Sequence, residues 1–218
     1  MNIAKKPTMI IVDDHLMFQQ GLKAVITAEN IATVIGEASN GSEFIEMLSH
    51  SKPDIVLMDI DMPQMNGMEA TQKAIELYPD LKIITLTMFS DEEYYYRMID
   101  LGVKGFVLKT TGISELEKAI HDVMLGESYF SNELLRKIIR NFSRNTTQKQ
   151  VENNILTNRE MDVLKEICLG STTDEIALKL NISSKTVKSH RSNLLEKTFC
   201  KNTASLILYS IKNKIIEL

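Results

Sequence analysis

The chain has 218 residues, 44% of them hydrophobic and 25% charged, a balance typical of a globular protein with one large or two small domains. No apolar run approaches the roughly 18 residues of a membrane-spanning helix, and Asp13 and Asp14 interrupt the N-terminal apolar segment before a signal-peptide core can form. These features argue against a membrane protein and predict a cytoplasmic one.

The two halves of the chain carry opposite charge. Residues 1–128 contain 10 Lys and Arg against 20 Asp and Glu, a net charge of −10, whereas residues 129–218 contain 15 against 9, a net charge of +6. Two differently charged solvated surfaces would explain this asymmetry, and so would a basic half that binds a polyanion such as DNA.

The first half alternates short apolar runs with longer amphipathic stretches. The runs predict five strands, at Thr8–Val12, Thr33–Glu37, Ile55–Met58, Lys82–Thr87 and Gly105–Leu108. Strands that alternate with helices favour an α/β domain with a doubly wound parallel sheet, helices on both faces and a ligand crevice at the carboxyl ends of the strands.

Polar side chains follow or end four of these runs: Asp13 and Asp14, Asp59, Thr87 and Lys109. Each one alone would be a helix cap, a turn former or a solvated charge. Together they would meet at one edge of the sheet, where carboxylates repel one another unless a cation such as Mg²⁺ intervenes. The aspartate that ends the third run is then placed to act as a nucleophile toward a phosphoryl group, with the threonine and the lysine positioned to bind its oxygens.

These residues, together with the segments "LMDIDMPQMNG" and "GFVLK", resemble the receiver domain of two-component response regulators over residues 7–128. The resemblance implies a five-stranded flavodoxin/CheY-like fold in which Asp59 is the phosphoacceptor. It also implies that Asp14, Asp59 and the backbone carbonyl of Asp61 hold Mg²⁺, with Asp13 also at the metal site. Two further residues would form the switch: Thr87, which would move toward the phosphate, and Phe106, which would change rotamer.

The sequence departs from the common receiver pattern at two positions. Thr110 stands where many receivers have Pro, and Phe106 replaces the commoner Tyr and lacks its hydroxyl. Exposed positions near the first helix, such as Leu16, Phe18 and Gln19, are candidates for selecting the partner kinase.

Three consecutive tyrosines, Tyr94–Tyr96, invite comparison with a platform for stacking bases. Adjacent residues on a helix point about 100° apart and cannot form one stacking row. Partial burial and a protein contact face are therefore the favoured interpretation.

The second half shows only helical periodicity. Residues 129–151 are predicted to be a linker with a helix, and residues 152–218 a helix-turn-helix domain. The two cysteines, Cys168 and Cys200, have no Cys or His neighbour at metal-ligand spacing, so we expect neither a disulfide framework nor a zinc site, and we place Cys168 in the core.

Residues typical of helix starts and helix ends mark the boundaries of the helices in this domain. Thr157 with Glu160 forms a capping box, and Gly170 fits a helix stop. A short helix over Thr173–Leu180, a turn at residues 181–182 and a helix from Ser183 or Ser184 to about Lys197 then match a motif whose second helix enters the DNA major groove.

The segments "LTNRE" and "EIALKLNISSKTVKSH", with the region around Leu206, resemble the LuxR/NarL-type DNA-binding domain. By this resemblance the candidate base readers are Lys188, Ser189 and Ser192. The candidates for phosphate contact are Lys185, Thr186, His190 and Arg191. A final helix, at about Thr203–Lys214, would form a dimer contact through Ser205, Ile207, Leu208 or Ile211. The segment from Lys197 to Cys200 departs from the family pattern.

Both resemblances together identify the chain as similar to NarL/FixJ-type response regulators. They imply a transcription factor that receives a phosphoryl group from a sensor histidine kinase and binds double-stranded DNA as a homodimer on activation. They imply no enzymatic activity beyond the phosphorylation and dephosphorylation of Asp59. A phosphatase of the haloacid-dehalogenase type, suggested by the Asp59-Ile60-Asp61 triplet, and a ligand-sensing LuxR regulator are the rival interpretations.

Overall fold

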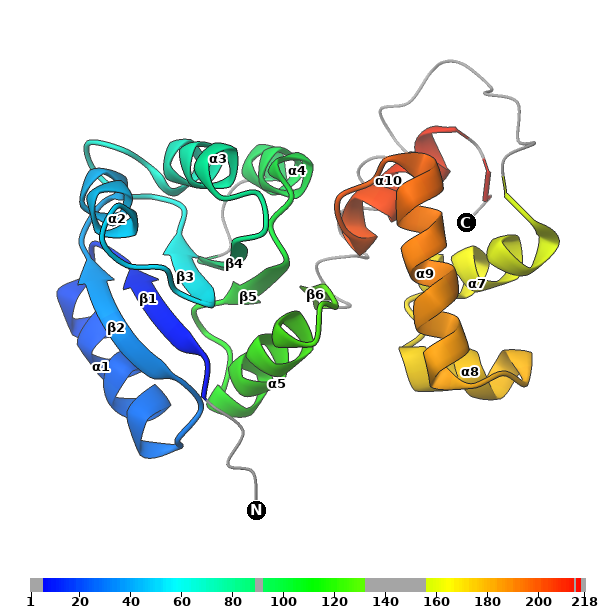
Figure 1. Cartoon of the computed structure of the whole chain (residues 1–218), viewed down its shortest axis with the longest axis horizontal. Coiled ribbons are helices and arrows are strands. Elements are labelled where there is room, and N and C mark those ends of the chain that lie inside the picture. Colours follow the sequence, from blue (N-terminus) through cyan, green and yellow to red (C-terminus); the bar gives the residue numbers. More distant parts are fainter. Residues whose placement is uncertain (1–5, 89–91, 132–155, 214, 217–218) are drawn as a thin grey trace. The chain divides into compact units, whose positions relative to one another are not determined.

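The five predicted strands all form in the computed structural model of the chain (Figure 1), which describes residues 6–88, 92–131, 156–213 and 215–216. Their bounds are β1 Thr8–Val12, β2 Thr33–Ala38, β3 Ile55–Asp59, β4 Lys82–Thr87 and β5 Gly105–Leu108. They pair in parallel in the order β2-β1-β3-β4-β5. The chain separates into two compact units, residues 1–129 and 130–218.

A sixth strand that the sequence did not predict, β6 Tyr129–Phe130, extends the sheet beside β5. The backbone N–H of Tyr129 donates to the carbonyl oxygen of Lys104 over 2.8 Å. Two residues are too few to show any hydrophobic period, so this strand leaves no signal in the sequence.

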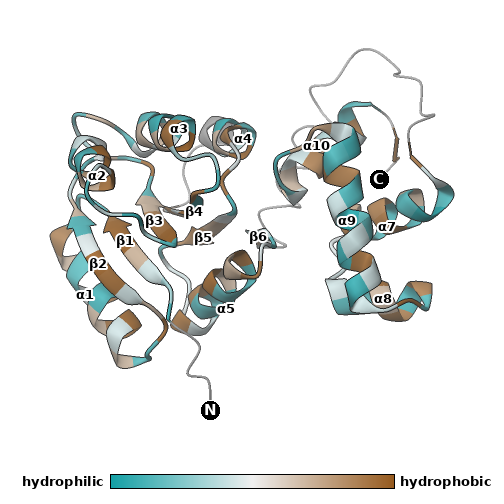
Figure 2. Cartoon of the chain, viewed as in Figure 1, coloured by the Kyte–Doolittle hydropathy of each residue, from teal (hydrophilic) through white to brown (hydrophobic). Residues whose placement is uncertain are grey.

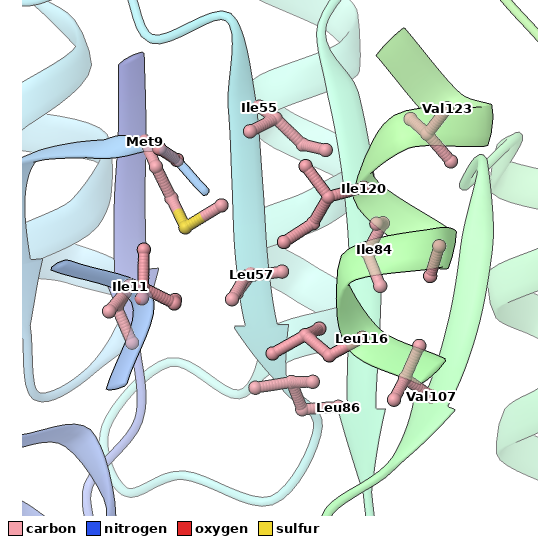
Figure 3. Close-up of a cluster of buried hydrophobic side chains, with 13 residues drawn as sticks. Met9, Ile11, Ile55, Leu57, Ile84, Leu86, Val107, Leu116, Ile120 and Val123 are labelled. Atoms are coloured by element: carbon pink, nitrogen blue, oxygen red, sulfur yellow. The ribbon is translucent and has the colours of Figure 1, made fainter. Parts of the chain in front are cut away.

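Helices cover both faces of the sheet (Figure 1). On one face lie α1 Leu16–Ala28 and α5 Ile113–Met124, and on the other lie α2 Gly41–Leu48, α3 Gly67–Leu77 and α4 Glu92–Leu101. Alternate strand residues such as Ile11, Leu57 and Ile84 form one buried cluster with Leu116 and Ile120 of α5 (Figure 3). Strands β1, β3, β4 and β5 are largely buried on both faces, which is why they appear as continuous apolar runs, whereas the edge strand β2 leaves Thr33 and Ile35 exposed.

The second unit is a set of four described helices: α7 Asn158–Cys168, α8 Thr173–Leu180, α9 Ser184–Thr198 and α10 Thr203–Lys212. The predicted capping box forms, since Thr157 accepts from the backbone of Glu160 and the Glu160 carboxylate accepts from the backbone of Thr157. The same carboxylate, which is buried, accepts from Lys197 over 2.7 Å and so ties α7 to α9. Burial raises the pKa of Glu160, but the hydrogen bonds from Lys197 and Thr157 outweigh it and hold that pKa below its ordinary value of 4.5.

The cysteine prediction is confirmed for the core position. Cys168 is buried in the core of the second unit, and burial raises the pKa of its thiol to about 12, so this cysteine is an inert core residue. Within residues 6–216, none of the helices that the structure describes combines the length and apolar character needed to span a bilayer. Most of the predicted linker, including its expected helix, falls outside the described residues.

Two helices of this unit end in left-handed residues of different kinds. Asn181 ends α8 with φ 53°, a conformation that Asn tolerates, and this residue makes the turn of the helix-turn-helix. Phe199 ends α9 with φ 55° and ψ 25°, and its side chain is 94% exposed. A bulky residue in the left-handed region of backbone conformation is strained. Because the ring of Phe199 is exposed, its removal would cost little packing energy.

We expect Phe199→Gly to stabilise the second unit by about 1 kcal/mol, because Gly adopts positive φ without strain. Hydrogen exchange of the α9 amides in the full chain measures this change. Leu169→Gly is the matched control, since Leu169 is the equivalent cap of α7, is 64% exposed and has an ordinary φ of −77°. That change should destabilise the unit by roughly 0.5–1 kcal/mol. Equal effects of the two substitutions would contradict the argument from strain.

Candidate functional site

The sheet register brings four functional strand ends to one edge. Val12 pairs with Met58, and Thr87 pairs with Leu108, so Asp13, Asp59, Thr87 and Lys109 all lie at the carboxyl ends of neighbouring strands. Parallel strands explain this arrangement, since all of their carboxyl ends point the same way.

Lys109 joins the two buried carboxylates of this edge. Its Nζ lies 2.8 Å from Asp13 Oδ2 and 2.8 Å from Asp59 Oδ2, and the three side chains are 6%, 0% and 5% exposed, respectively. The backbone N–H of Lys109 donates to the carbonyl oxygen of Thr87, which fixes the start of the side chain. The ring of Phe18 lies 5.1 Å from the same Nζ and adds a cation–π contact.

One ammonium group shared between two buried carboxylates leaves excess negative charge. Burial raises the pKa of Asp59 above its ordinary value of 3.8, against the opposing effect of Lys109, and the neighbouring Asp13 raises it further. Burial lowers the pKa of Lys109, but its hydrogen bonds to Asp13 and Asp59 outweigh this and raise it above 10.5, so the lysine stays charged. With Asp14 included, three carboxylates face a single cation.

The donor set at this edge suits a divalent cation. Ligand atoms of Asp13, Asp14, His15 and Asp59 all lie within 4.8 Å of one another. Three carboxylates and one ammonium leave a net charge of −2, and carboxylate oxygens are the ligands preferred by hard divalent ions. The residues therefore fit the metal that a receiver fold implies.

The other predicted receiver residues take distinct positions. Asp61 is exposed two residues beyond Asp59. Thr87 is buried, and its hydroxyl donates to the carbonyl oxygen of Met88 over 3.3 Å. Phe106 is buried, and its ring meets that of Tyr95 edge to face, with the centroids 5.4 Å apart. Tyr95 is therefore a buried partner of the predicted switch residue, and for this tyrosine the expected burial is found.

Two residues that position the site were missed or misread from the sequence. Gln19 is buried on α1, and its Nε2 donates to the backbone carbonyl of Ala38 over 2.8 Å, so its prediction as an exposed kinase-selecting position is wrong. Gly67 starts α3 so close to β3 that a Cβ atom there would lie 1.8 Å from the carbonyl oxygen of Asp59. The glycine of the "MNG" segment thus allows the loop after Asp59 to close against β3, and its place in a turn-rich loop was the available signal.

The second helix of the helix-turn-helix, α9, presents a polar outer face. Ser183 caps it by accepting from the backbone of Thr186, while Val187 and Leu194 are fully buried on its inner face. Figure 2 colours most of α9 teal or white. The exposed side chains of its predicted DNA-contact set are Lys185, Lys188, Ser189 and Ser192.

The remaining predicted DNA contacts are only partly exposed. Thr186 exchanges a hydrogen bond with the hydroxyl of Ser183 over 2.7 Å, and Arg191 donates to the hydroxyl of Thr173 at the start of α8 over 3.1 Å. The Nδ1 atom of His190 is buried and lacks a hydrogen-bond partner among the described residues. Their roles at phosphates stay predictions.

The predicted dimer helix needs one correction. Ile207 is buried in the core of its own unit, so its side chain is not available to a second copy, and its prediction as a dimer residue is wrong. Leu208 is also buried but is 8% exposed, Ser205 donates to the carbonyl oxygen of Asn202 at the start of α10, and Ile211 packs partly against the core. For these three the dimer role stays a prediction.

Comparison with known proteins agrees with both units. Residues 9–121 match the family described as response regulator receiver domain, and residues 154–210 match the bacterial regulatory proteins of the luxR family. The oxygen regulatory protein NreC of Staphylococcus aureus is 34% identical over 214 residues, which cover 96% of this chain and 99% of NreC.

Two solved structures match nearly the whole length of the chain. The response regulator ChrA of a heme-sensing two-component system is 25% identical, with a TM-score of 0.53, and the match covers 97% of this chain and 99% of ChrA. The two-component response regulator RcsB in its DNA complex is 25% identical, with a TM-score of 0.59, over 95% of this chain and 99% of RcsB. The chain therefore belongs to the two-component response regulators that join a receiver domain to a LuxR-type DNA-binding domain.

Proposed function

We propose that Asp59 accepts a phosphoryl group from a sensor histidine kinase, and that the phosphorylated protein binds double-stranded DNA as a homodimer through α9. The observation that carries this proposal is the buried group of Asp13, Asp59 and Lys109 at the carboxyl edge of the sheet, in a chain that also bears a polar, capped second helix in a helix-turn-helix. RcsB, which matches 95% of this chain, has been solved as two dimers bound to two parallel DNAs. We place the protein in the cytoplasm.

In the phosphorylation step, an Oδ atom of Asp59 attacks the phosphorus of the donor. A P–O bond forms as the bond between phosphorus and the donor nitrogen breaks, and the product is an acyl phosphate. Lys109, which pairs with Asp59 in the resting state, then pairs with the phosphoryl oxygens, because they carry the new negative charge. The product remains on the protein, so we propose no catalytic turnover beyond formation and hydrolysis of this bond.

We propose Mg²⁺ as the bound cation, held by Asp13, Asp14, Asp59 and the carbonyl oxygen of Asp61. When bound, the ion would supply positive charge to balance the carboxylates and the incoming phosphoryl group. The protein's own residues position these ligands. Gln19 Nε2 donates to the backbone carbonyl oxygen of Asp13 over 3.3 Å and so holds the end of β1, and Gly67 allows the loop that carries Asp61 to fold against β3.

The switch follows from the resting contacts of two residues. The hydroxyl of Thr87 must leave the carbonyl oxygen of Met88 to donate to a phosphoryl oxygen. That movement would open space beside Phe106, whose ring is held edge to face by Tyr95 in α4. The structural change caused by phosphorylation would thus be transmitted to the surface of α4 without requiring a hydroxyl group on residue Phe106.

Labelling with radioactive acetyl phosphate tests the site. We expect an alkali-labile phosphoprotein in Mg²⁺ and almost none in EDTA, because the excess carboxylate charge then repels the donor. Equal labelling in EDTA would contradict a metal role. Steady release of phosphate from a phosphomonoester would instead support the phosphatase alternative.

A further inference from the structure

His15 extends the acidic group at the carboxyl edge with a donor of a different chemistry. It follows Asp14 directly, and its Nδ1 lies 2.9 Å from Asp14 Oδ1 and 3.4 Å from Asp13 Oδ1. Its backbone N–H donates to Asp13 Oδ1 over 2.9 Å, which fixes the residue against the group. The imidazole is 69% exposed and so lies at the mouth of the site.

Helix capping does not account for this side chain. His15 occupies the N-cap position of α1 but makes no side-chain capping hydrogen bond. Ser, Thr, Asp and Asn are the residues that stabilise a helix from this position. The imidazole is directed at the carboxylates instead.

The spacing of the donor atoms matches the coordination shell of one ion. Ligands at about 2.1 Å from an octahedral cation lie roughly 3 Å apart when adjacent and about 4.2 Å apart when opposite. The two distances from His15 Nδ1 to carboxylate oxygens bracket the edge of that octahedron, and the whole group of four lies within 4.8 Å. A small adjustment would place all four donors around a single ion.

We propose that His15 is a further ligand of the metal site and that it shifts the preference of the site from Mg²⁺ toward borderline divalent cations such as Co²⁺ and Zn²⁺. Mg²⁺ keeps oxygen ligands and water, whereas imidazole nitrogen suits the later first-row transition ions. The inference rests on the metal site of the proposed function, and it concerns which ion that site selects.

The alternative role of His15 is to orient Asp14 through a hydrogen bond without touching the ion. A residue of that kind supports a carboxylate that every cation uses, so its loss would weaken the binding of all cations alike. A direct ligand affects only the ions that accept imidazole. Selectivity between ions therefore separates the two roles.

The test uses calorimetric titration of the unphosphorylated full chain with Mg²⁺, Co²⁺ and Zn²⁺. For His15→Ala we expect the Kd for Co²⁺ and Zn²⁺ to rise at least about tenfold, while the Kd for Mg²⁺ stays within about twofold. His121→Ala is the matched control, because His121 is 70% exposed and lies 3.5 Å from a single carboxylate, that of Asp122. The control should leave all three affinities unchanged.

Nitrogen NMR of the histidine side chains gives an independent readout. Zn²⁺ should shift the Nδ1 resonance of His15, and Mg²⁺ should leave it in place. Equal weakening of all three ions in His15→Ala, or no weakening of any, would overturn the inference while the metal site itself stands. A wild-type protein that binds none of the three ions would overturn the metal site and this inference together.

Discussion

Replacement of Asp59 by Asn should abolish phosphoryl transfer to the protein. The amide keeps the size of the side chain but removes the anionic oxygen that attacks phosphorus, and the backbone N–H of Ile60 keeps its acceptor at the same position. The measurement is radioactive labelling by acetyl phosphate in Mg²⁺, with labelling of the variant at background. Since Asn leaves Lys109 paired with Asp13, we expect the fold to be retained.

Asp80→Asn is the matched control for this experiment. Asp80 is exposed just before β4, at the opposite edge of the sheet from Asp59, so its replacement should leave labelling at the wild-type level. Substantial labelling of Asp59→Asn would place the phosphoacceptor elsewhere and contradict the account.

Replacement of Lys188 by Ala should cost roughly 1–3 kcal/mol of specific DNA binding and flatten base preference at one position of the site. Lys188 is exposed in the N-terminal half of α9, the part of a recognition helix that contacts base edges. Competition binding at fixed salt, with duplexes that vary one base at a time, measures both effects.

Lys185→Ala and Lys165→Ala provide the contrast. Lys185 is a predicted phosphate contact, so its loss should weaken binding to all sequences about equally and lower the salt dependence by about one ion. Lys165 is an exposed lysine of α7 outside the predicted surface, and its loss should change little. Unchanged base preference in Lys188→Ala would remove this residue from the base readers.

Most of the receiver fold could be predicted from the sequence because four of its strands, β1, β3, β4 and β5, are largely buried on both faces. Such strands appear as continuous apolar runs, and the rule that parallel strands share a carboxyl edge then places Asp13, Asp59, Thr87 and Lys109 together. The predicted bounds of β1, β4 and β5 agree with the structure. Helix caps were equally readable, because Thr157 and Glu160 act within one turn of one another.

What the sequence could not show depends on contacts between distant segments. The burial of Gln19 depends on the carbonyl of Ala38, nineteen residues away, and no local pattern reports such a partner. The sequence could not show which apolar residues of α10 face the core of their own unit and which would face a second copy, because a helix uses the same residue types for both. Ile207 belongs to the core. His15 reads as an ordinary loop residue until its distance to Asp14 is known.

The measurement that tests the central claim most directly is DNA binding by the full chain, with and without acetyl phosphate and Mg²⁺. It would use duplexes selected from random sequence, at fixed salt, and compare the wild type with Asp59→Asn. We predict that the phosphodonor tightens binding by the wild type alone, which would link the receiver site to α9. Wild-type binding that ignores the phosphodonor would contradict that link and leave the two domains functionally separate.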